Sequence, residues 1–379
     1  MSNFTIGVEE EYQLVDAATS ELMSSAQSVL AGDWTGEIRT ELQASTIEIG
    51  TLVCESSEGV RRELRRLRAQ AAVAAGAQDL QIVAAGVHPF SDWRGQQLSG
   101  GERYARMAET YGRIARDEHN FGMHIHVAVE GDRMRLLNIL RDYIPHLTAL
   151  GCSSPFFEGE DSGYDSYRMV LWRRWPGAGP PPRLACDADY RRYVDGMLRA
   201  GVIGDERNLY WSIRPHAAYP TLEFRMCDVC PRISDAVAIA ALIRTLVFAA
   251  AEGMLTPSAT HWGPEAMDAA LADDCWRACR SGLRARFVNP EVEPGFESAS
   301  DAVLRLLDAL APAADMIGET SALTDVAGII DDGTGADRLR AFHRECDDLV
   351  VATRWLAAET LVGAAMDRLG VLREVPECA

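Results

Sequence analysis

The chain has 379 residues, of which 47% are hydrophobic and 25% are charged, a composition typical of a globular protein with one large or two moderate cores. Its formal net charge is −19, and all 37 basic residues are arginine. A field of this sign repels nucleic acid, and the basic surface of a nucleic-acid-binding protein is missing. Without lysine, phosphate has to be bound by arginine and metal.

The first predicted strand, Thr5–Val15, begins almost at once. No signal segment precedes it, so we expect a cytoplasmic protein. The longest apolar run, Ile233–Glu252, contains Asp235 and Arg244. Because a charge at the centre of a membrane costs about 2.5–3.5 kcal/mol, we predict a buried helix here and no contact with a membrane.

Strands and helices alternate along the chain. Residues that alternate between apolar and polar predict strands at Thr5–Val15, Ser45–Val53, Leu80–Gly86, Gly122–Glu130 and Thr221–Val229. Helical periodicity predicts helices at Glu58–Gly76, Gly101–Asp117, Arg133–Gly151, Ala188–Ala200, Ile233–Glu252 and over most of Glu297–Leu372. No Gly-rich dinucleotide motif follows any strand. The pattern predicts a mixed α+β fold around a mostly antiparallel sheet, in one domain over residues 1–379.

An arginine-rich segment lies in the predicted helix Glu58–Gly76. Val60, Leu64 and Leu67 recur at helical spacing and mark its face toward the core. We assign the arginines of this segment to the outer face of the helix: Arg61, Arg62, Arg65, Arg66 and Arg68.

The first strand carries an unusually acidic face. Side chains alternate along a strand, so Glu9, Glu11 and Gln13 share one face. The other face carries Ile6, Val8, Glu10, Tyr12 and Leu14. Carboxylates two positions apart are about 7 Å apart and repel each other unless a cation lies between them. Magnesium prefers such oxygens and also binds substrate phosphates.

Three later strands repeat this pattern. Their polar faces carry Glu48 with Glu41 upstream, then His124 and His126, and then Glu223 and Arg225. Taken alone, each strand is better explained as the solvated face of an antiparallel sheet. Together they favour a metal–phosphate site. Five glutamates plus ATP would require two or three divalent ions, with arginine at the transferring phosphoryl group.

The nine cysteines allow a second, different metal site. Cys227 and Cys230 form a CxxC pair, and Cys275 and Cys279 lie one helical turn apart. Two such pairs could supply four thiolates to zinc. Reduced thiols with no metal are the simpler interpretation.

Several motifs resemble the type-2 glutamate–cysteine ligase family, also called the carboxylate–amine ligases. They are GVEEEYQLVD, GVHPFSDW, FGMHIHVAVE, Tyr167-Arg168 followed by RWPGAGPP, WSIRPH, PTLEFRMCDV, WRACRSGL and GTGADRLR, in family order from residue 5 to about residue 340. The resemblance implies a glutamine-synthetase-like fold, in which a curved, mostly antiparallel sheet forms a funnel with helices on its outer face. It also implies ATP-dependent formation of an amide, through an acyl phosphate, between a carboxylate such as the γ-carboxyl of glutamate and an amine such as cysteine.

The resemblance further implies cofactors, partners and site residues. The cofactors are ATP and two or three Mg²⁺ ions, which Mn²⁺ could replace; the partners are small-molecule substrates, and a homodimer is suggested. The metal ligands would be Glu9, Glu11, Glu41, Glu48, His124 and Glu223. Arg225 and Arg214 would neutralise phosphate as catalytic and nucleotide-binding residues, and Arg168 would grip a substrate carboxylate or phosphate.

Two motifs depart from the family pattern. The family often has Glu-Asn before WRA, where this chain has Asp273-Asp274-Cys275, and a Gln after GADR, where this chain has Leu339. Both affect the expected positioning of substrates and leave the chemistry unchanged.

Two other functions compete with the ligase. One is a metal-dependent amidohydrolase built on His124 and His126, which would need no nucleotide and would prefer zinc with nitrogen ligands. The excess of carboxylates over histidines argues against it. The other is a non-catalytic sensor of a nucleotide or metabolite, which would not need the full acidic set. In the ligase, His126 would either support the metal site or be structural.

Overall fold

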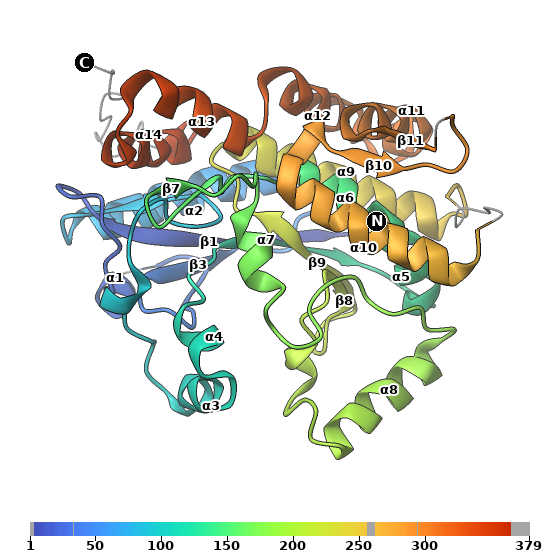
Figure 1. The fold of residues 1–379 in the computed structure, drawn as a ribbon, viewed down its shortest axis with the longest axis horizontal. Helices are drawn as coiled ribbons and strands as arrows, with labels where there is room; N and C mark the ends of the chain where they lie inside the picture. The colour runs from blue at the N-terminus through green and yellow to red at the C-terminus, as the bar shows by residue number, and fades with distance from the viewer. Residues whose placement is uncertain (1–3, 33, 256–261, 294, 365–379) are drawn as a thin grey trace.

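A seven-stranded antiparallel sheet runs through the centre of the protein (Figure 1). The computed structural model describes residues 4–32, 34–255, 262–293 and 295–364. The strand order is β2-β3-β1-β5-β9-β8, and β4 pairs with the far half of β1. The strands are β1 (Ile6–Asp16), β2 (Glu37–Thr40), β3 (Thr46–Gly50), β4 (Leu80–Val83), β5 (Gly122–Ala128), β8 (Ile213–Pro215) and β9 (Thr221–Asp228). Two small hairpins are formed by β6 (Phe156–Phe157) with β7 (Glu160–Asp161), and by β10 (Arg286–Val288) with β11 (Phe296–Ser298).

Helices cover one face of this sheet in two layers, the upper face in Figure 1. The helices on this side are α2 (Ser57–Gly76), α5 (Arg133–Leu140), α6 (Ile144–Leu150), α9 (Ile233–Ala251), α10 (Pro264–Ser281), α11 (Ala299–Ile317), α12 (Thr320–Asp332), α13 (Gly335–Cys346) and α14 (Leu349–Leu361). Below the sheet lie α1 (Ala26–Val29), α3 (Glu102–Tyr111), α4 (Arg113–Arg116), α7 (Tyr167–Trp172) and α8 (Asp187–Arg199). Short 3₁₀ turns occur at Trp93–Gly95, Arg141–Tyr143, Glu206–Asn208 and Gly282–Arg284.

The core forms between the sheet and the first helix layer. Ile6, Val8, Tyr12 and Leu14 of β1 are at most 1% exposed and point toward the helices, as strand alternation predicts. Helix α9 has the length and apolar character of a membrane span, but 94% of its most apolar window is buried within the protein. The prediction of a buried helix is therefore confirmed.

One charged pair lies inside this core. Arg68 of α2 was expected on the outer face, and that prediction is wrong, because its side chain is fully buried. Its guanidinium donates to both carboxylate oxygens of Glu10, at 3.0 and 2.6 Å, and to the carbonyls of Pro231, Thr360 and Cys230. Every guanidinium N–H therefore has an acceptor, which is the condition for burying such a charge.

The predicted elements are largely confirmed, with three kinds of difference. The helix expected over 101–117 is divided at Gly112, whose φ is +57°, and the one over 133–151 is divided before Pro145. Several short strands and three helices were not predicted: β2, β6, β7, β8, β10, α1, α7 and α10. The helical region expected from Glu297 begins as β11, and its last eight predicted residues lie outside the described residues. The predicted fold class, a mostly antiparallel sheet packed with helices, is confirmed.

Candidate active site

The predicted polar residues meet on the face of the sheet that the helix layers leave uncovered. Glu9 on β1 lies opposite His124 on β5, and Glu11 lies opposite Glu48 on β3. Glu48 in turn lies opposite Arg39 on β2. Because side chains directly across an antiparallel pair are about 4.5–5.5 Å apart at Cβ, this register brings four strands together. We call the polar side chains on this face the acidic row; on these four strands they are Arg39, Glu48, Glu11, Glu9 and His124.

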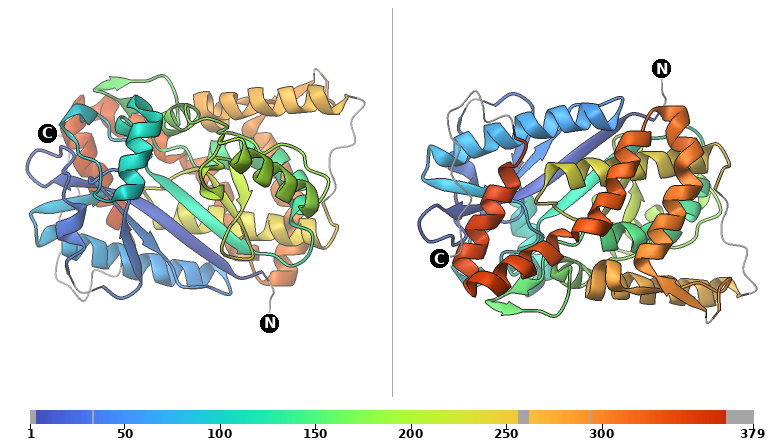
Figure 2. Two further views of the ribbon diagram at one scale, coloured as in Figure 1. Left: turned by 90° about the horizontal axis from the view of Figure 1, so that it is seen from below. Right: turned by 90° about the horizontal axis from the view of Figure 1, so that it is seen from above.

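The acidic row continues to the other edge of the sheet. His126 on β5 lies opposite Glu223 on β9, which lies opposite Arg214 on β8. In the view from below, β1 and β5 are seen between helices α3 and α4 on one side and α8 on the other (Figure 2, left). The row therefore crosses six strands on a face with helices at its sides.

A bulge interrupts the alternation of side chains along β9. Met123 pairs with Cys227 and Ile125 with Phe224, so β9 has one more residue than β5 between these pairs. Beyond the bulge the faces exchange, and the Cys227 thiol donates to a backbone carbonyl of helix α6 on the opposite face. Glu223 and Arg225 are therefore the β9 residues that join the row before the bulge.

Glu9 is the most highly connected carboxylate of the row. Its Oε2 is 3.4 Å from His124 Nδ1 and 3.4 Å from His126 Nε2, and its Oε1 is 2.6 Å from Arg39 Nη2. Burial alone would raise its pKa, but the contacts with His124 and His126 hold the pKa well below the usual range. Glu9 is therefore ionised at neutral pH.

Glu11, Glu41 and Glu48 form the part of the row with the greatest excess of negative charge. Burial raises the pKa of Glu11 to about 7, and the charge of Glu41 adds to the effect. Burial also raises the pKa of Glu48 well above its usual range, and the charges of Glu41 and Glu9 raise it further. Carboxylates this close cannot all ionise without added positive charge. This segment of the row therefore has the electrostatics of a cation site.

Glu223 is compensated by two arginines at the other end. Arg214 donates to both of its oxygens, at 2.7 and 3.1 Å, and Arg225 donates to one, at 2.6 Å. These charges hold the pKa of Glu223 below its usual range despite burial, which opposes them. Arg214 also donates to the carbonyls of Arg207 and Leu209. Four of the five N–H groups of the Arg214 guanidinium therefore have acceptors within the protein.

Arg225 keeps donors available. Its guanidinium lies 4.9 Å from the ring centroid of Trp172, a cation–π distance. Its Nε has no hydrogen-bond partner among the described residues. Arg225 is therefore better placed than Arg214 to bind an anionic ligand.

Arg168 lies behind the row. Its side chain is fully buried, and its Nη1 donates to the carbonyl of Arg225 at 3.2 Å. It packs so closely on Gly122 that a Cβ there would lie 2.2 Å from Nη2. The N–H of Gly122 donates to Glu11. Arg168 therefore supports the backbone around Glu11 and Arg225, and its predicted role in gripping a substrate carboxylate or phosphate stays a prediction.

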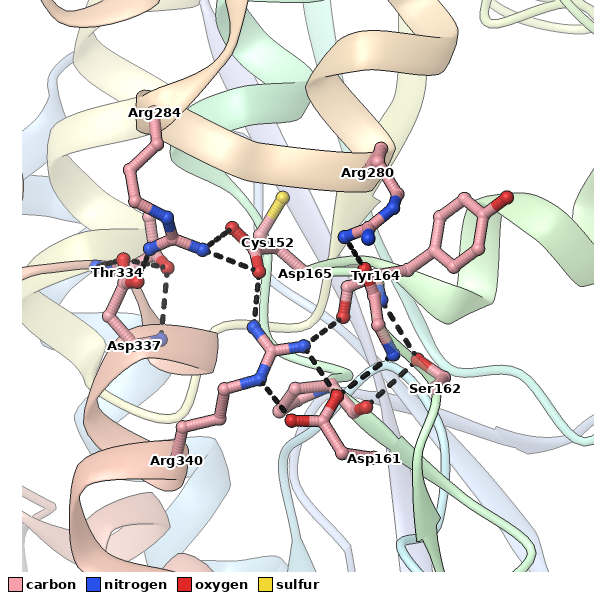
Figure 3. A network of polar contacts seen from close by, with 12 residues as sticks. Cys152, Asp161, Ser162, Tyr164, Asp165, Arg280, Arg284, Thr334, Asp337 and Arg340 are labelled. Atoms are coloured by element: carbon pink, nitrogen blue, oxygen red, sulfur yellow. Dashed lines mark hydrogen bonds and ion pairs between the residues drawn. The ribbon is translucent and has the colours of Figure 1, made fainter. Parts of the chain in front are cut away.

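An ion-pair network outside the row holds the segment that precedes α7 (Figure 3). Asp165, which is 1% exposed, accepts from Arg284 at 2.7 and 2.9 Å and also from Arg340. Arg340 reaches on to Asp161, and Arg284 to Asp337. The network joins α13 and the 3₁₀ turn Gly282–Arg284 to the loop before α7, and it gives a structural role to the GTGADRLR motif. Arg280 of the WRACRSGL motif also donates to the carbonyl of Gly163 in this loop.

This loop is connected directly to the sheet. Ser166 caps the N-terminus of α7 and donates to Asp228 at the end of β9, at 2.7 Å. Ser154 donates to the same carboxylate at 2.6 Å and accepts from the N–H of Arg168. Helix α7 is thereby fixed relative to β9, and the position of Arg168 follows.

The donor set of the row fits a divalent cation. Burial, followed by the charge of Arg225, lowers the pKa of His124 to about 4, so its imidazole is neutral at pH 7, as a metal ligand must be. Its Nε2 makes no hydrogen bond and lies 4.0 Å from Glu11 Oε1. In the part of the chain that the structure describes, no three His, Cys, Asp or Glu side chains are grouped closely enough to hold a metal as they stand.

The cysteine pairs do not form the alternative zinc site among the described residues. Cys227, Cys230, Cys275 and Cys279 are all buried free thiols. Burial raises the pKa of Cys227 and of Cys279 to about 12. They are therefore protonated, and both donate to backbone carbonyls.

Sequence reasoning missed Arg39. The structure brings Glu9, Glu11, Glu48, His124 and His126 together on one face, as the strand alternation predicts. Glu41 lies just beyond β2 and acts on Glu11 and Glu48 through its charge. Arg39 lies two residues before Glu41 in the four-residue edge strand β2, whose alternation was too short to be recognised. Their roles as metal and phosphate ligands remain predictions.

Comparison with solved structures defines the class of fold. The glutamate–cysteine ligase of Francisella tularensis, solved in complex with AMP, has a TM-score of 0.69 at 14% identity, covering 95% of this chain and 89% of that one. A bifunctional glutathione synthetase from Pasteurella multocida has a TM-score of 0.68 at 17% identity, covering 97% of this chain and 53% of that one. At these identities the likeness shows the fold, which is that of glutamate–cysteine ligases.

The family follows from the sequence comparisons. The model of glutamate–cysteine ligase family 2 matches residues 5–353. Two proteins named "Putative glutamate--cysteine ligase 2" are 34% identical over 369 residues in Roseiflexus castenholzii and 35% identical over 374 residues in Thermobifida fusca. These matches cover 95% of this chain, and 95% and 92% of the two relatives. The chain belongs to glutamate–cysteine ligase family 2 and is an amide-bond-forming ligase.

Proposed function

We propose that this ligase uses ATP and divalent metal to join the γ-carboxyl of glutamate to an amine through an acyl phosphate. The observation that carries the proposal is the acidic row, in which Glu9, Glu11, Glu48, Glu223 and His124 share one sheet face with Arg225, with Glu41 just beyond β2. ATP adds several negative charges to a face that is already strongly negative, so positive charge has to come from metal ions and arginine. The AMP bound to the Francisella ligase supports a nucleotide on this fold.

Each residue of the row has a defined part in this proposal. Two or three Mg²⁺ ions, or Mn²⁺ ions in their place, would be held by five carboxylates and one imidazole: Glu9, Glu11, Glu41, Glu48, Glu223 and His124. When bound, these ions supply charge neutralisation at the phosphoryl group. Arg225, with a free Nε–H, binds a phosphate oxygen, and Arg214 holds Glu223 in place. His126 contacts Glu9 and fixes the orientation of its carboxylate.

The chemistry needs activation of a poor acyl donor. A carboxylate oxygen of glutamate attacks the γ-phosphorus of ATP, and the bond to the bridging oxygen of ADP breaks. The amine then attacks the acyl carbon, phosphate leaves with the original carboxylate oxygen, and the amine loses a proton. The chain contributes position and electrostatic stabilisation, the terms that dominate phosphoryl transfer.

A screen of carboxylate donors against amines, read by phosphate release with and without Mg²⁺, tests this function. We expect release that requires glutamate, an amine, ATP and Mg²⁺ together. Glutamate labelled with ¹⁸O in the γ-carboxyl should transfer the label to inorganic phosphate. Absence of turnover across a broad amine panel would count against the ligase, and unlabelled phosphate would count against the acyl phosphate.

The same assays separate the competing functions. An amidohydrolase built on His124 and His126 would cleave amides without ATP, and a sensor would bind nucleotide, seen as a thermal shift, without releasing phosphate. Membership of a ligase family favours the ligase over both. We further propose a cytoplasmic location, which the eight free cysteines among the described residues support.

A further inference from the structure

Arg39 reaches from the edge strand β2 to two carboxylates of the acidic row. Its Nη2 lies 2.6 Å from Glu9 Oε1 and also contacts Glu48 Oε1, while its Nε donates to Glu48 Oε1 at 2.6 Å. One nitrogen atom therefore contacts oxygens from two different strands. The side chain of Arg39 is 50% exposed, whereas those of Glu9 and Glu48 are 21% and 4% exposed. The guanidinium of Arg39 therefore lies nearest the solvent, and the carboxylates of Glu9 and Glu48 lie beneath it.

This position is the one that a cation shared by Glu9 and Glu48 would need. Mg²⁺ binds carboxylate oxygens at about 2.1 Å, so it cannot lie between the two oxygens while the Nη2 atom is there. The positive charges would also repel each other. Occupation by Arg39 and occupation by a divalent ion therefore exclude each other.

We propose that Arg39 is a built-in counter-ion of the metal-free site, which the divalent cation bound by Glu9 and Glu48 has to displace. The inference rests on the proposed function only because that function requires the cation. It assigns Arg39 a role in controlling how tightly the metal binds, whatever amine is the substrate.

The fold permits this displacement without movement of the sheet. Residues Glu37–Thr40 remain paired with β3 through the backbone, so only the Arg39 side chain has to leave. Ion pairs with an exposed arginine contribute little to stability and are easily given up. Arg214 and Arg225 cannot act in this way, since both are buried and pair with Glu223.

Manganese binding without nucleotide or substrate tests the proposal, with free Mn²⁺ counted by electron paramagnetic resonance. Arg39→Gln should bind Mn²⁺ roughly tenfold more tightly than the wild type, because a competing charge is lost. Arg39→Met, a second neutral variant, should behave in the same way, which separates the effect from any folding defect of one variant. Arg39→Lys should stay near the wild type because the charge remains.

Two control variants make the result specific. Arg61→Gln removes an ion pair with Glu58 on the outside of α2 and should leave Mn²⁺ affinity unchanged. Glu48→Gln should weaken Mn²⁺ binding whether or not Arg39 is present. Unchanged or weaker binding in both neutral Arg39 variants would overturn the proposal. If Glu48→Gln weakens binding in that case, only the role of Arg39 is wrong; if the wild type binds no Mn²⁺, the proposed metal site is wrong as well.

Discussion

Glu11 on β1 and Glu48 on β3 lie directly opposite each other, with side chains that are 12% and 4% exposed. Two like charges in this position oppose folding unless one is protonated or a cation lies beside them. Apolar or mixed residues here would stabilise the protein better. The pair therefore lowers the stability of the protein, and it attracts positive charge to this part of the sheet.

Replacing either residue by its amide should separate these two effects. In Glu11→Gln or Glu48→Gln, we expect Mg²⁺-dependent turnover to fall by roughly 100-fold or more, because a cation ligand is lost. The melting temperature without metal should stay the same or rise, because a repulsion is removed. Initial rates and thermal melting measure the two quantities. Glu58→Gln, at a 62% exposed position on α2, is the matched control, and a wild-type rate in both variants would remove these residues from the site.

Arg214 and Arg225 should differ in what they contribute, although both bind Glu223. Arg225→Gln should reduce kcat/KM by roughly 100-fold, the scale of a lost donor at a developing charge, with a small change in stability. Arg214→Gln should cost more stability, because the bonds to two backbone carbonyls are lost as well. Kinetics and urea denaturation on the same two variants provide the comparison. The reverse ranking would assign the phosphate to Arg214.

The sequence was sufficient to predict which face of each strand is polar and that these faces belong to one site. Strand alternation fixes the side on which Glu9, Glu11 and His124 lie, and this held in the structure. It could not reveal that Arg39 bridges Glu9 and Glu48, because a four-residue edge strand has almost no periodicity of its own. It also gave no reason to place Arg168 behind Gly122, since that contact depends on how α7 is tied to β9.

Arg68 shows a second limit of what could be predicted from the sequence. The arginine run of α2 was assigned to the outer face, although Arg68 lies four residues after Leu64 and three before Ala71, both buried. Helical spacing therefore favoured the buried face, and the residue type was given too much weight. Its partner, Glu10, comes from the strand 58 residues earlier, which no local pattern shows. The second glutamate of the EEE sequence serves the core, and the first and third serve the acidic row.

Loss of the Arg68–Glu10 pair should affect stability more than chemistry. Arg68→Met leaves Glu10 buried without its partner, which is expected to lower the free energy of unfolding by about 3–5 kcal/mol. Turnover of the fraction that remains folded should be close to that of the wild type, because the pair lies on the helix side of the sheet. Urea denaturation and rates at low temperature measure both. Arg66→Met, two residues away with a partly exposed ion pair to Glu63, should cost less than about 1 kcal/mol, and equal losses in the two variants would contradict the buried role.

Asp274 should make stability depend on pH. Its side chain is 7% exposed and accepts from the N–H of Val288, and burial, followed by the charge of Asp273, raises its pKa to about 7 from 3.8. Between these values the folded protein keeps a proton that the unfolded chain has lost, so this group makes stability fall as pH rises from about 4 to about 7.

Asp274→Asn keeps an acceptor for Val288 and removes the titration. We therefore expect the variant to be more stable than the wild type at pH 8, by on the order of 2 kcal/mol, with the advantage shrinking toward pH 4. Urea denaturation at several pH values measures the difference. Asp273→Asn, at the exposed neighbouring position that pairs with Arg277, should leave most of the slope in place. Parallel pH profiles for Asp274→Asn and the wild type would show that Asp274 is ionised in the folded protein, and the bonds from Val288 would then outweigh its burial.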